Sequence, residues 1–318
     1  MTALITGICG FAGRHLAQHL LDCGEHVFGT YLDAADRALL GPLARKVGLL
    51  QGDVRNPQKM GVVLRKTEPD VIYHLAAQAS IAVSFVKPVA TVDTNVTGTV
   101  GMLEAVRRER PGTRVLFPSS ADVYGLVRPK DVPIRETHPT APRNPYAVSK
   151  LAAEEVCRQY ARTYGLSVII ARSFNHTGPG QAQGFVIPDF ASQIARLEKQ
   201  RGGVLKVGNL NARRDLSDVR DIVRGYRLLA AKGKPGEVYH LGSGKAHRIK
   251  DLLELLLNMA SGPVKIQRDP ARQRPSDLPI LMADTGRTRR RTGWRTQIPL
   301  ERTLADTLEY WRTHGHEK

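Results

Sequence analysis

Two side chains near the middle of the chain have the types and the spacing needed to transfer a proton. They are Tyr146 and Lys150, in the segment Y-A-V-S-K. Residues four apart lie on one face of a helix, so the phenol and the ammonium would be neighbours. A free tyrosine, with a pKa of about 10, is a poor acid or base at neutral pH, but a nearby positive charge lowers that pKa. The pair therefore predicts a tyrosine that exchanges a proton with a bound substrate.

A hydroxyl group upstream could bind the oxygen on which this proton acts. Ser119 and Ser120 follow the apolar run 115–118, which has the composition of a buried strand. At the end of such a strand, the Ser120 hydroxyl could hydrogen bond a substrate carbonyl and orient it towards Tyr146. A Tyr-x-x-x-Lys spacing often arises by chance, so its weight comes from this serine and from the glycine-rich segment described next. We expect Ser119, Ser120 and Asp122 to contact the substrate.

A glycine-rich segment follows the first apolar run of the chain. It contains Gly7, Gly10, Phe11, Ala12 and Gly13 and opens into an amphipathic, leucine-containing stretch. Glycine lets the backbone turn tightly and approach a pyrophosphate, while N–H groups at the start of the next helix bind phosphate. An ordinary glycine-rich turn is the alternative. The position at the first strand–helix junction favours a dinucleotide-binding site formed by these five residues.

The sequence indicates less clearly which residues would bind the adenosine end of the dinucleotide. Asp33 lies about 20 residues past Gly13, where a carboxylate binds the ribose of an unphosphorylated dinucleotide. It comes two residues after the expected end of the second strand, and Arg37 follows, so an exposed loop aspartate explains it equally well. Thr30 and Tyr31 are the other candidates. NADP(H) and NAD(H) therefore both stay open as cofactors.

Two further segments follow apolar runs and would lie in the same crevice. Asp53 and Val54 come after the third run, and Leu75, Ala76 and Ala77 come at and after the end of the fourth. In open parallel sheets, ligands bind at the carboxyl ends of the strands. Small alanines would let a flat adenine or a ribose lie against the backbone, although such residues also serve plain packing. We expect all five to contact the dinucleotide.

The elements that must position these residues alternate in type along the first half of the chain. Short apolar runs are separated by helical stretches, the pattern of a parallel sheet with helices on both faces. The expected strands are 3–6, 27–31, 47–51, 71–75, 115–118 and 167–171, and the expected helices include 14–21, 94–108 and 147–164. This pattern predicts an α/β fold with a Rossmann-type doubly wound parallel sheet.

The alternation loosens after residue 172. The stretch 175–185 is rich in Gly and Gln, and 262–299 is rich in Pro and Arg, interrupted by an expected strand at 237–241 and an expected helix at 249–260. We interpret the second half as a smaller substrate-binding lobe, with some segments returning to the sheet. The predicted division is a dinucleotide-binding domain at 1–172 and 216–247, and a lobe at 173–215 and 248–318.

Composition limits the class of protein. The 318 residues carry a formal net charge of +17, and 42% of them are hydrophobic, which argues against a disordered polybasic chain. Three cysteines, with no C-x-x-C pair, favour neither a disulfide framework nor a zinc site and suit the reducing cytoplasm. No apolar run approaches the ~18 residues needed to span a bilayer. We expect a cytoplasmic protein with no metal and no membrane partner.

The positive charge is unevenly distributed. Residues 265–302 hold ten Lys or Arg against four Asp or Glu, whereas residues 1–60 hold six against five. A nucleic-acid-binding protein would show such a charge, but polyphosphate binding and solubility explain it as well. The arginine-rich run 287–291 is interpreted as a solvated helix end. We expect no nucleic-acid partner and keep nucleic-acid binding as the non-enzymatic alternative.

The motifs together resemble the extended short-chain dehydrogenase/reductase family, also called the NAD-dependent epimerase/dehydratase family. The resemblance rests on T-G-I-C-G-F-A-G at 6–13, D-V at 53–54, H-L-A-A at 74–77, N-V-T-G-T at 95–99, S-S-A-D-V-Y-G at 119–125 and Y-A-V-S-K at 146–150. It implies a Rossmann fold, a bound nicotinamide cofactor and a catalytic triad of Ser120, Tyr146 and Lys150. It also implies that Lys150 binds the nicotinamide ribose and that Asn95 supports the active-site helix.

The second half is similar to the GDP-sugar branch of that family. The similar segments are A-R-S-F-N-H-T-G-P-G-Q at 171–181, V-G-N-L-N-A-R-R-D-L-S-D-V-R-D at 207–221 and R-P-S-D at 274–277. The resemblance implies that Asn175, Arg214, Arg274 and Asp277 bind the nucleotide diphosphate-sugar and that His176 lies near the cofactor. Guanidinium groups suit phosphate oxygens, and a carboxylate suits a ribose diol. Taken singly, each arginine would be a solvated surface charge.

The segment after Ser120 bears on the reaction. Dehydratases of this branch resemble one another in carrying a Thr followed by an acid pair, or by a small residue and Glu, at this strand end. This chain has Ser120-Ala121-Asp122, whose only carboxylate is one methylene shorter than that of Glu. The resemblance therefore implies reduction of the C4 ketone of GDP-4-keto-6-deoxy-D-mannose to GDP-D-rhamnose. It also implies a homodimer formed through the helices that follow Asn95 and Tyr146.

Two enzymatic alternatives stay open. A reductase that delivers hydride to the opposite face would form GDP-6-deoxy-D-talose, and the sequence does not distinguish the two faces. The other alternative is a GDP-mannose 4,6-dehydratase, which yields the keto sugar without net consumption of cofactor.

Overall fold

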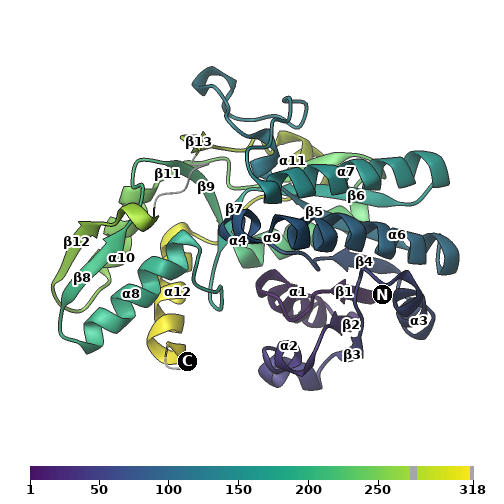
Figure 1. Cartoon of the computed structure of the whole chain (residues 1–318), viewed down its shortest axis with the longest axis horizontal. Helices are drawn as coiled ribbons and strands as arrows, with labels where there is room; N and C mark the ends of the chain where they lie inside the picture. Colours follow the sequence, from purple (N-terminus) through teal and green to yellow (C-terminus); the bar gives the residue numbers. More distant parts are fainter. Residues whose placement is uncertain (273–277, 316–318) are drawn as a thin grey trace.

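The computed structural model describes residues 1–272 and 278–315. Its centre is a seven-stranded sheet in which every pairing is parallel, in the order β10-β6-β5-β4-β1-β2-β3 (Figure 1). The strands are β1 (Thr2–Thr6), β2 (His26–Tyr31), β3 (Gly48–Gln51), β4 (Val71–His74), β5 (Arg114–Ser120), β6 (Val168–Ser173) and β10 (Val238–Leu241). From β1, the chain winds through β2 and β3 to one side and through β4, β5 and β6 to the other. The predicted Rossmann-type doubly wound sheet is confirmed.

Both faces of this sheet are buried. In β1, Ala3 and Ile5 belong to one apolar cluster and Leu4 to another, because successive strand residues face opposite sides. The first cluster contains residues of α1 (Phe11–Asp22) and α9 (Val219–Lys232). The second contains residues of α3 (Pro57–Thr67), α6 (Gly98–Glu109) and α7 (Pro145–Tyr164). Burial on two faces explains why the strands are continuous apolar runs.

A separate apolar core lies in the second half of the chain. It is formed mainly by α8 (Val186–Lys199), α10 (Ile249–Asn258) and α12 (Leu300–His314), with β8 (Gly203–Val207) paired in parallel to β12 (Val264–Arg268). These elements form the lobe at the left of Figure 1. A small sheet lies between this lobe and the central sheet and contains β7 (Asn175–Thr177), β9 (Arg213–Asp218), β11 (Ala246–Arg248) and β13 (Ile280–Leu281). The separate core supports the two-lobe division, which we retain as a proposal.

Short elements complete the described chain. They are α2 (Ala34–Ala38), α4 (Ile81–Val86), α5 (Pro88–Val92), α11 (Gly286–Thr292), a π-helical turn (Asp93–Thr97) and four 3-10 turns at Gly41–Arg45, Ala121–Tyr124, Pro129–Asp131 and Pro270–Arg272. The helix expected over 94–108 thus begins with the π-helical turn and continues as α6. Among the residues that the structure describes, no helix is both long enough and apolar enough to span a membrane.

The second half contains more regular structure than the sequence predicts. Helices α8, α9 and α12 were not expected, and the Pro- and Arg-rich stretch 262–299 includes β12, β13 and α11. The arginine run lies on α11, where Arg289 and Arg290 are exposed. Arg287 donates to the Val238 carbonyl and Arg291 to the Lys232 carbonyl. Part of the run therefore ties α11 to neighbouring elements instead of being only solvated.

Candidate active site

The start of α7 sets the position of the predicted catalytic pair. The Asn144 side chain caps the helix by accepting a hydrogen bond from the Ala147 N–H at 2.7 Å. Pro145 occupies the first helical position, where an N–H is not needed. Because the helix begins just before Tyr146, Tyr146 and Lys150 lie one turn apart on the same face of α7.

Ser120 ends β5 beside Tyr146. Its hydroxyl donates to Asp122 Oδ2 at 3.0 Å and accepts from the Asp122 N–H at 3.2 Å. Burial raises the pKa of Tyr146 and the Asp122 charge raises it further, whereas a hydrogen bond with Ser120 lowers it. The phenol therefore holds its proton at neutral pH, the state from which it can act as an acid. The structure brings Ser120, Asp122 and Tyr146 close together, and their contacts with a substrate stay predictions.

Lys150 is buried next to Tyr146 on α7. Its Nζ donates to the Pro118 carbonyl at 2.7 Å and lies 4.8 Å from the centroid of the Phe117 ring. Burial lowers the pKa of Lys150 to about 8, because the charged form loses solvation. Since burial dominates at Tyr146, the lowering of the tyrosine pKa by Lys150 stays a prediction.

Ser119 faces the core beneath α7. It is buried, and its hydroxyl donates to the buried carboxylate of Glu154, which in turn forms an ion pair with Arg172 of β6. With this partner in the core, Ser119 lies outside the substrate site that we propose below.

Asn95 ties the π-helical turn to α7. Its Nδ2 donates to Ser149 Oγ at 2.8 Å and to the Gln78 carbonyl at 3.0 Å, and its Oδ1 accepts from the Gln78 N–H at 2.8 Å. Ser149 lies between Tyr146 and Lys150 in the sequence. This position suits the supporting role that the family resemblance implies for Asn95.

The glycine-rich segment forms a cradle between β1 and α1. Gly7 has φ +69°, and a Cβ placed on it would lie 2.8 Å from Ala76 Cα. A Cβ on Gly13 would lie 2.5 Å from the Gly7 carbonyl oxygen. The N-cap of α1 is Gly10, which has no side chain to occupy the free N–H groups at the positive end of the helix. These groups and the close backbone approach fit a dinucleotide pyrophosphate.

The carboxylates expected at the adenosine end have local partners. Asp33 is the N-cap of α2 and accepts from the Asp36 N–H at 2.9 Å. Asp53 forms an ion pair with Arg55 at 2.7 Å, and hydrogen bonds from Arg55 lower the pKa of Asp53. Both residues lie at the carboxyl ends of sheet strands, but their contacts with a cofactor, like those of Val54, Leu75 and Ala77, stay predictions.

His176 connects the cradle to the second half of the chain. Its ring stacks on that of Phe11, with centroids 6.3 Å apart and planes 9° apart. Its Nδ1 donates to the Phe174 carbonyl at 3.1 Å, and burial lowers its pKa, so the ring is neutral at pH 7. His176 therefore lies beside the first residue of α1, near the expected pyrophosphate site.

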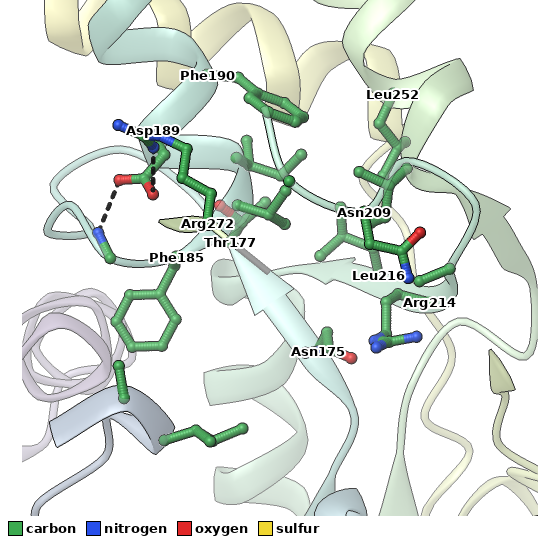
Figure 2. Close-up of a pocket in the computed structure, with 18 of the residues that line it drawn as sticks. Asn175, Thr177, Phe185, Asp189, Phe190, Asn209, Arg214, Leu216, Leu252 and Arg272 are labelled. Carbon is green, nitrogen blue, oxygen red and sulfur yellow. Dashed lines mark hydrogen bonds and ion pairs between the residues drawn. The ribbon is translucent and has the colours of Figure 1, made fainter. Parts of the chain in front are cut away.

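A cavity of about 490 Å³ adjoins His176 (Figure 2). Its wall includes Asn175 and Arg214, two of the predicted substrate ligands. Arg214 donates to the Leu278 carbonyl at 2.6 Å, which holds its guanidinium in place. In Figure 2, Arg214 lies at the right, and Asp189 and Arg272 lie towards the left. The cavity thus has polar ends and an apolar middle, which suits a nucleotide.

Several cavity residues were not found from the sequence. They come from α4, α8, β8, β9, α10 and the turn at Pro270–Arg272, and they include Phe85, Phe185, Asp189, Phe190, Lys206, Asn209 and Arg272. The apolar 3.6-residue period of α8 could have identified that helix, but it carries no indication of which face lines a cavity. The predicted ligands Arg274 and Asp277 lie outside the described residues.

Comparison with known proteins places the whole chain in one family. The family described as GDP-mannose 4,6 dehydratase matches residues 4–307. The GDP-6-deoxy-D-mannose reductase of Pseudomonas aeruginosa is 37% identical, over 99% of this chain and 98% of the relative. A GDP-mannose 4,6-dehydratase of Sinorhizobium fredii is 30% identical, over 92% of this chain and 91% of the relative. The structure of the Pseudomonas aeruginosa enzyme RMD complexed with NADPH is 34% identical, covers 98% of this chain and 99% of that one, and has a TM-score of 0.85.

Proposed function

The chain belongs to the GDP-mannose 4,6-dehydratase family of extended short-chain dehydrogenases/reductases, and we propose that it reduces the C4 ketone of GDP-4-keto-6-deoxy-D-mannose with NADPH or NADH. The product is GDP-D-rhamnose. The reductase relative supports this substrate, and its 37% identity exceeds the 30% identity of the dehydratase relative.

The observation that carries the proposal is the set of side chains at the end of β5 and on the facing turn of α7. Ser120, Tyr146 and Lys150 supply the groups needed for ketone reduction, and the position after Ser120 is the buried Ala121, which has no carboxylate. The remaining acid, Asp122, accepts a hydrogen bond from the catalytic serine itself. A dehydratase must also remove a proton beside the ketone and expel the C6 hydroxyl. A single short carboxylate engaged with Ser120 suits simple reduction better.

The residues of the chain have distinct roles in this reaction. A bound reduced nicotinamide supplies the hydride to C4. Ser120 donates a hydrogen bond to the ketone oxygen and orients it, and Tyr146 transfers its phenolic proton to the same oxygen as charge develops there. Lys150 binds the nicotinamide ribose and stabilises the phenolate that remains, until solvent returns the proton.

The substrate occupies the cavity beside His176. Arg214 contacts the diphosphate, Asn175 contacts the nucleotide sugar, and Asp122 contacts a sugar hydroxyl. The proposal also includes Arg274 and Asp277, from the family resemblance alone. The cradle residues from Gly7 to Gly13 bind the cofactor pyrophosphate, with Phe11 and Ala12 at the start of α1. Their fit to a pyrophosphate supports this assignment.

The protein acts in the cytoplasm as a homodimer. Free thiols at Cys9, Cys23 and Cys157 support a reducing compartment. The family resemblance implies a contact through the helices that follow Asn95 and Tyr146, which are α6 and α7. The dimer contact that we propose consists of the exposed side of α7 together with α4 and α5, which precede Asn95. Apolar side chains exposed on these helices support it, namely Val83, Val86, Val89, Val92 and Val148. Sedimentation of the wild type and of Val89→Glu tests the dimer, and a wild-type monomer contradicts it.

The reaction is tested with GDP-4-keto-6-deoxy-D-mannose and NADPH or NADH. Loss of absorbance at 340 nm, dependent on the keto sugar, is expected, and NMR of the product should show the D-rhamno configuration at C4. The talo configuration would assign hydride delivery to the opposite face. Conversion of GDP-mannose to the keto sugar without net cofactor consumption would assign the chain as a dehydratase.

A further inference from the structure

We propose that Glu154 is a positioning residue for the active site, which through Ser119 fixes the end of β5 against α7. The inference rests on the proposed reduction, because it assigns Glu154 the task of keeping Ser120 within reach of Tyr146. Glu154 touches neither of the proposed ligands, so it acts only through its neighbours.

Consecutive residues at the end of β5 contact α7 at successive points. The Pro118 carbonyl accepts from Lys150 Nζ at 2.7 Å, and Ser120 lies close enough to Tyr146 to lower the pKa of its phenol. Ser119, between them, donates its hydroxyl to Glu154. The strand end is therefore held by three contacts with one helix, and two of the three involve catalytic side chains.

The contact between Ser119 and Glu154 is the most deeply buried of the three. Glu154 lies one helical turn beyond Lys150 on α7, and its side chain is fully buried. The Ser119 hydroxyl that it binds belongs to the residue covalently next to Ser120. A shift of Ser119 along the strand direction would therefore move Ser120 by a similar distance.

Glu154 itself cannot rotate freely. Arg172 of β6 donates to both of its oxygens, from Nε at 2.8 Å and from an Nη at 2.6 Å. Arg158 donates to it at 3.0 Å, and a second Nη of Arg172 donates to the Tyr124 hydroxyl at 2.8 Å. A planar two-point contact fixes direction as well as distance. The carboxylate that receives the Ser119 hydroxyl is thus anchored by the neighbouring strand.

Position is a better explanation for this pair than stability. A buried ion pair adds little net stability compared with apolar residues of similar size, because both charges lose their hydration. An error of about 1 Å in the placement of a reacting group, however, can lower a rate on the order of 100-fold. A rigid acceptor for Ser119, the residue next to the catalytic serine in the chain, meets that requirement.

The test uses Ser119→Ala, because Glu154→Gln would leave Arg172 buried without a counter-charge and could prevent folding. Ser119→Ala removes one hydroxyl and leaves the ion pair intact. We expect kcat for the keto sugar to fall about 10-fold or more. KM and the cofactor dissociation constant should stay within about twofold of wild type, since neither ligand is touched. The isotope effect with cofactor deuterated at the transferred position should rise, because chemistry becomes slower.

Thr67→Val is the matched control. It also removes one buried hydroxyl, which donates to the Val63 carbonyl on α3 far along the chain from the site. It should lose similar thermal stability and keep wild-type kcat. A Ser119→Ala enzyme with wild-type kcat and isotope effect overturns the proposal, as does an equal loss of kcat in both variants.

Crystal structures of the wild type and of Ser119→Ala provide a measurement that needs no substrate. We expect the variant to lose the contact between Ser120 and Tyr146, and an unchanged arrangement overturns the proposal. A wild-type chain that does not reduce the keto sugar contradicts the proposed function instead, and this structural comparison then decides the role of Glu154.

Discussion

His176 of β7 stacks on Phe11 of α1, with ring centroids 6.3 Å apart and planes only 9° apart. Phe11 is the first residue of the helix whose N-terminus faces the cradle, and His176 also lines the cavity. One aromatic contact therefore joins the two proposed ligand sites. Because the cradle and β7 are more than 150 residues apart in sequence, only the fold brings them together.

His176→Ala should weaken both ligands at once. An aromatic pair contributes about 1 kcal/mol, so we expect the dissociation constants of cofactor and of GDP to rise by roughly 3- to 10-fold each. Fluorescence titration of the reduced cofactor and calorimetry with GDP measure the two constants. His19→Ala, in the last turn of the same helix, is the control and should leave both unchanged. A change confined to one ligand would show that the stack does not join the sites.

Tyr146→Phe should abolish turnover while the substrate still binds. The variant lacks the proton that neutralises the new alkoxide, so we expect kcat to fall on the order of 1,000-fold or more. GDP-sugar affinity should change little, because Arg214 and Asn175 of the cavity are retained. Steady-state rates and calorimetry separate the two effects. Full activity in this variant would refute the assignment of Tyr146 as the acid.

The pH dependence of activity should report on Lys150. Burial lowers its pKa to about 8, and the proposed roles of this residue require the ammonium form. We therefore expect kcat/KM to fall as the pH rises through about 8, since kcat/KM reports the free enzyme. The measurement is an initial-rate profile from pH 6 to 10 with cofactor and keto sugar both well below saturation. Activity that stays constant up to pH 10 would contradict a required ammonium with this pKa.

The stability of the ligand-free protein should increase over the pH range in which the activity falls. The pKa of Lys150 is about 8 in the folded chain and 10.5 as its ordinary value, so between these pH values the unfolded chain binds more protons. The free energy of unfolding contributed by this residue therefore increases from pH 8 towards 10.5. Lys150→Met removes the contribution, so the free energy of unfolding of the wild type minus that of the variant should increase over that range. Urea denaturation at each pH measures it.

The parts that the sequence predicted are those with local patterns. The cradle from Gly7 to Gly13 and the pair Tyr146 and Lys150 are each encoded within a few residues, and apolar runs defined the central strands. The contact of Ser119 with Glu154 spans 35 residues, and no local pattern indicates it. Ser119 was accordingly predicted to be a substrate ligand.

The cavity was harder to predict for the same reason. Its wall combines Phe85 of α4, Asp189 of α8 and Arg272, which come from three distant parts of the chain. Helices α8 and α12 pack into one core, but the apolar period of α8 indicates neither that partner nor the face that lines the cavity. Connecting segments of unequal length separate these helices from the strands, so the alternation of strands and helices did not predict their positions.

Gly13→Ala tests the cradle by sterics alone. A Cβ at this position would lie 2.5 Å from the Gly7 carbonyl oxygen and 2.7 Å from the Ile8 carbonyl oxygen, and backbone atoms cannot rotate away as a side chain can. The turn must shift, and the N–H groups proposed to bind the pyrophosphate shift with it. We expect cofactor affinity to fall at least about 100-fold, because the loss involves several hydrogen bonds to charged oxygens.

Gly112→Ala is the control, since a Cβ there meets open space. Fluorescence titration should show wild-type binding for Gly112→Ala, and equally tight binding by Gly13→Ala would place the pyrophosphate elsewhere.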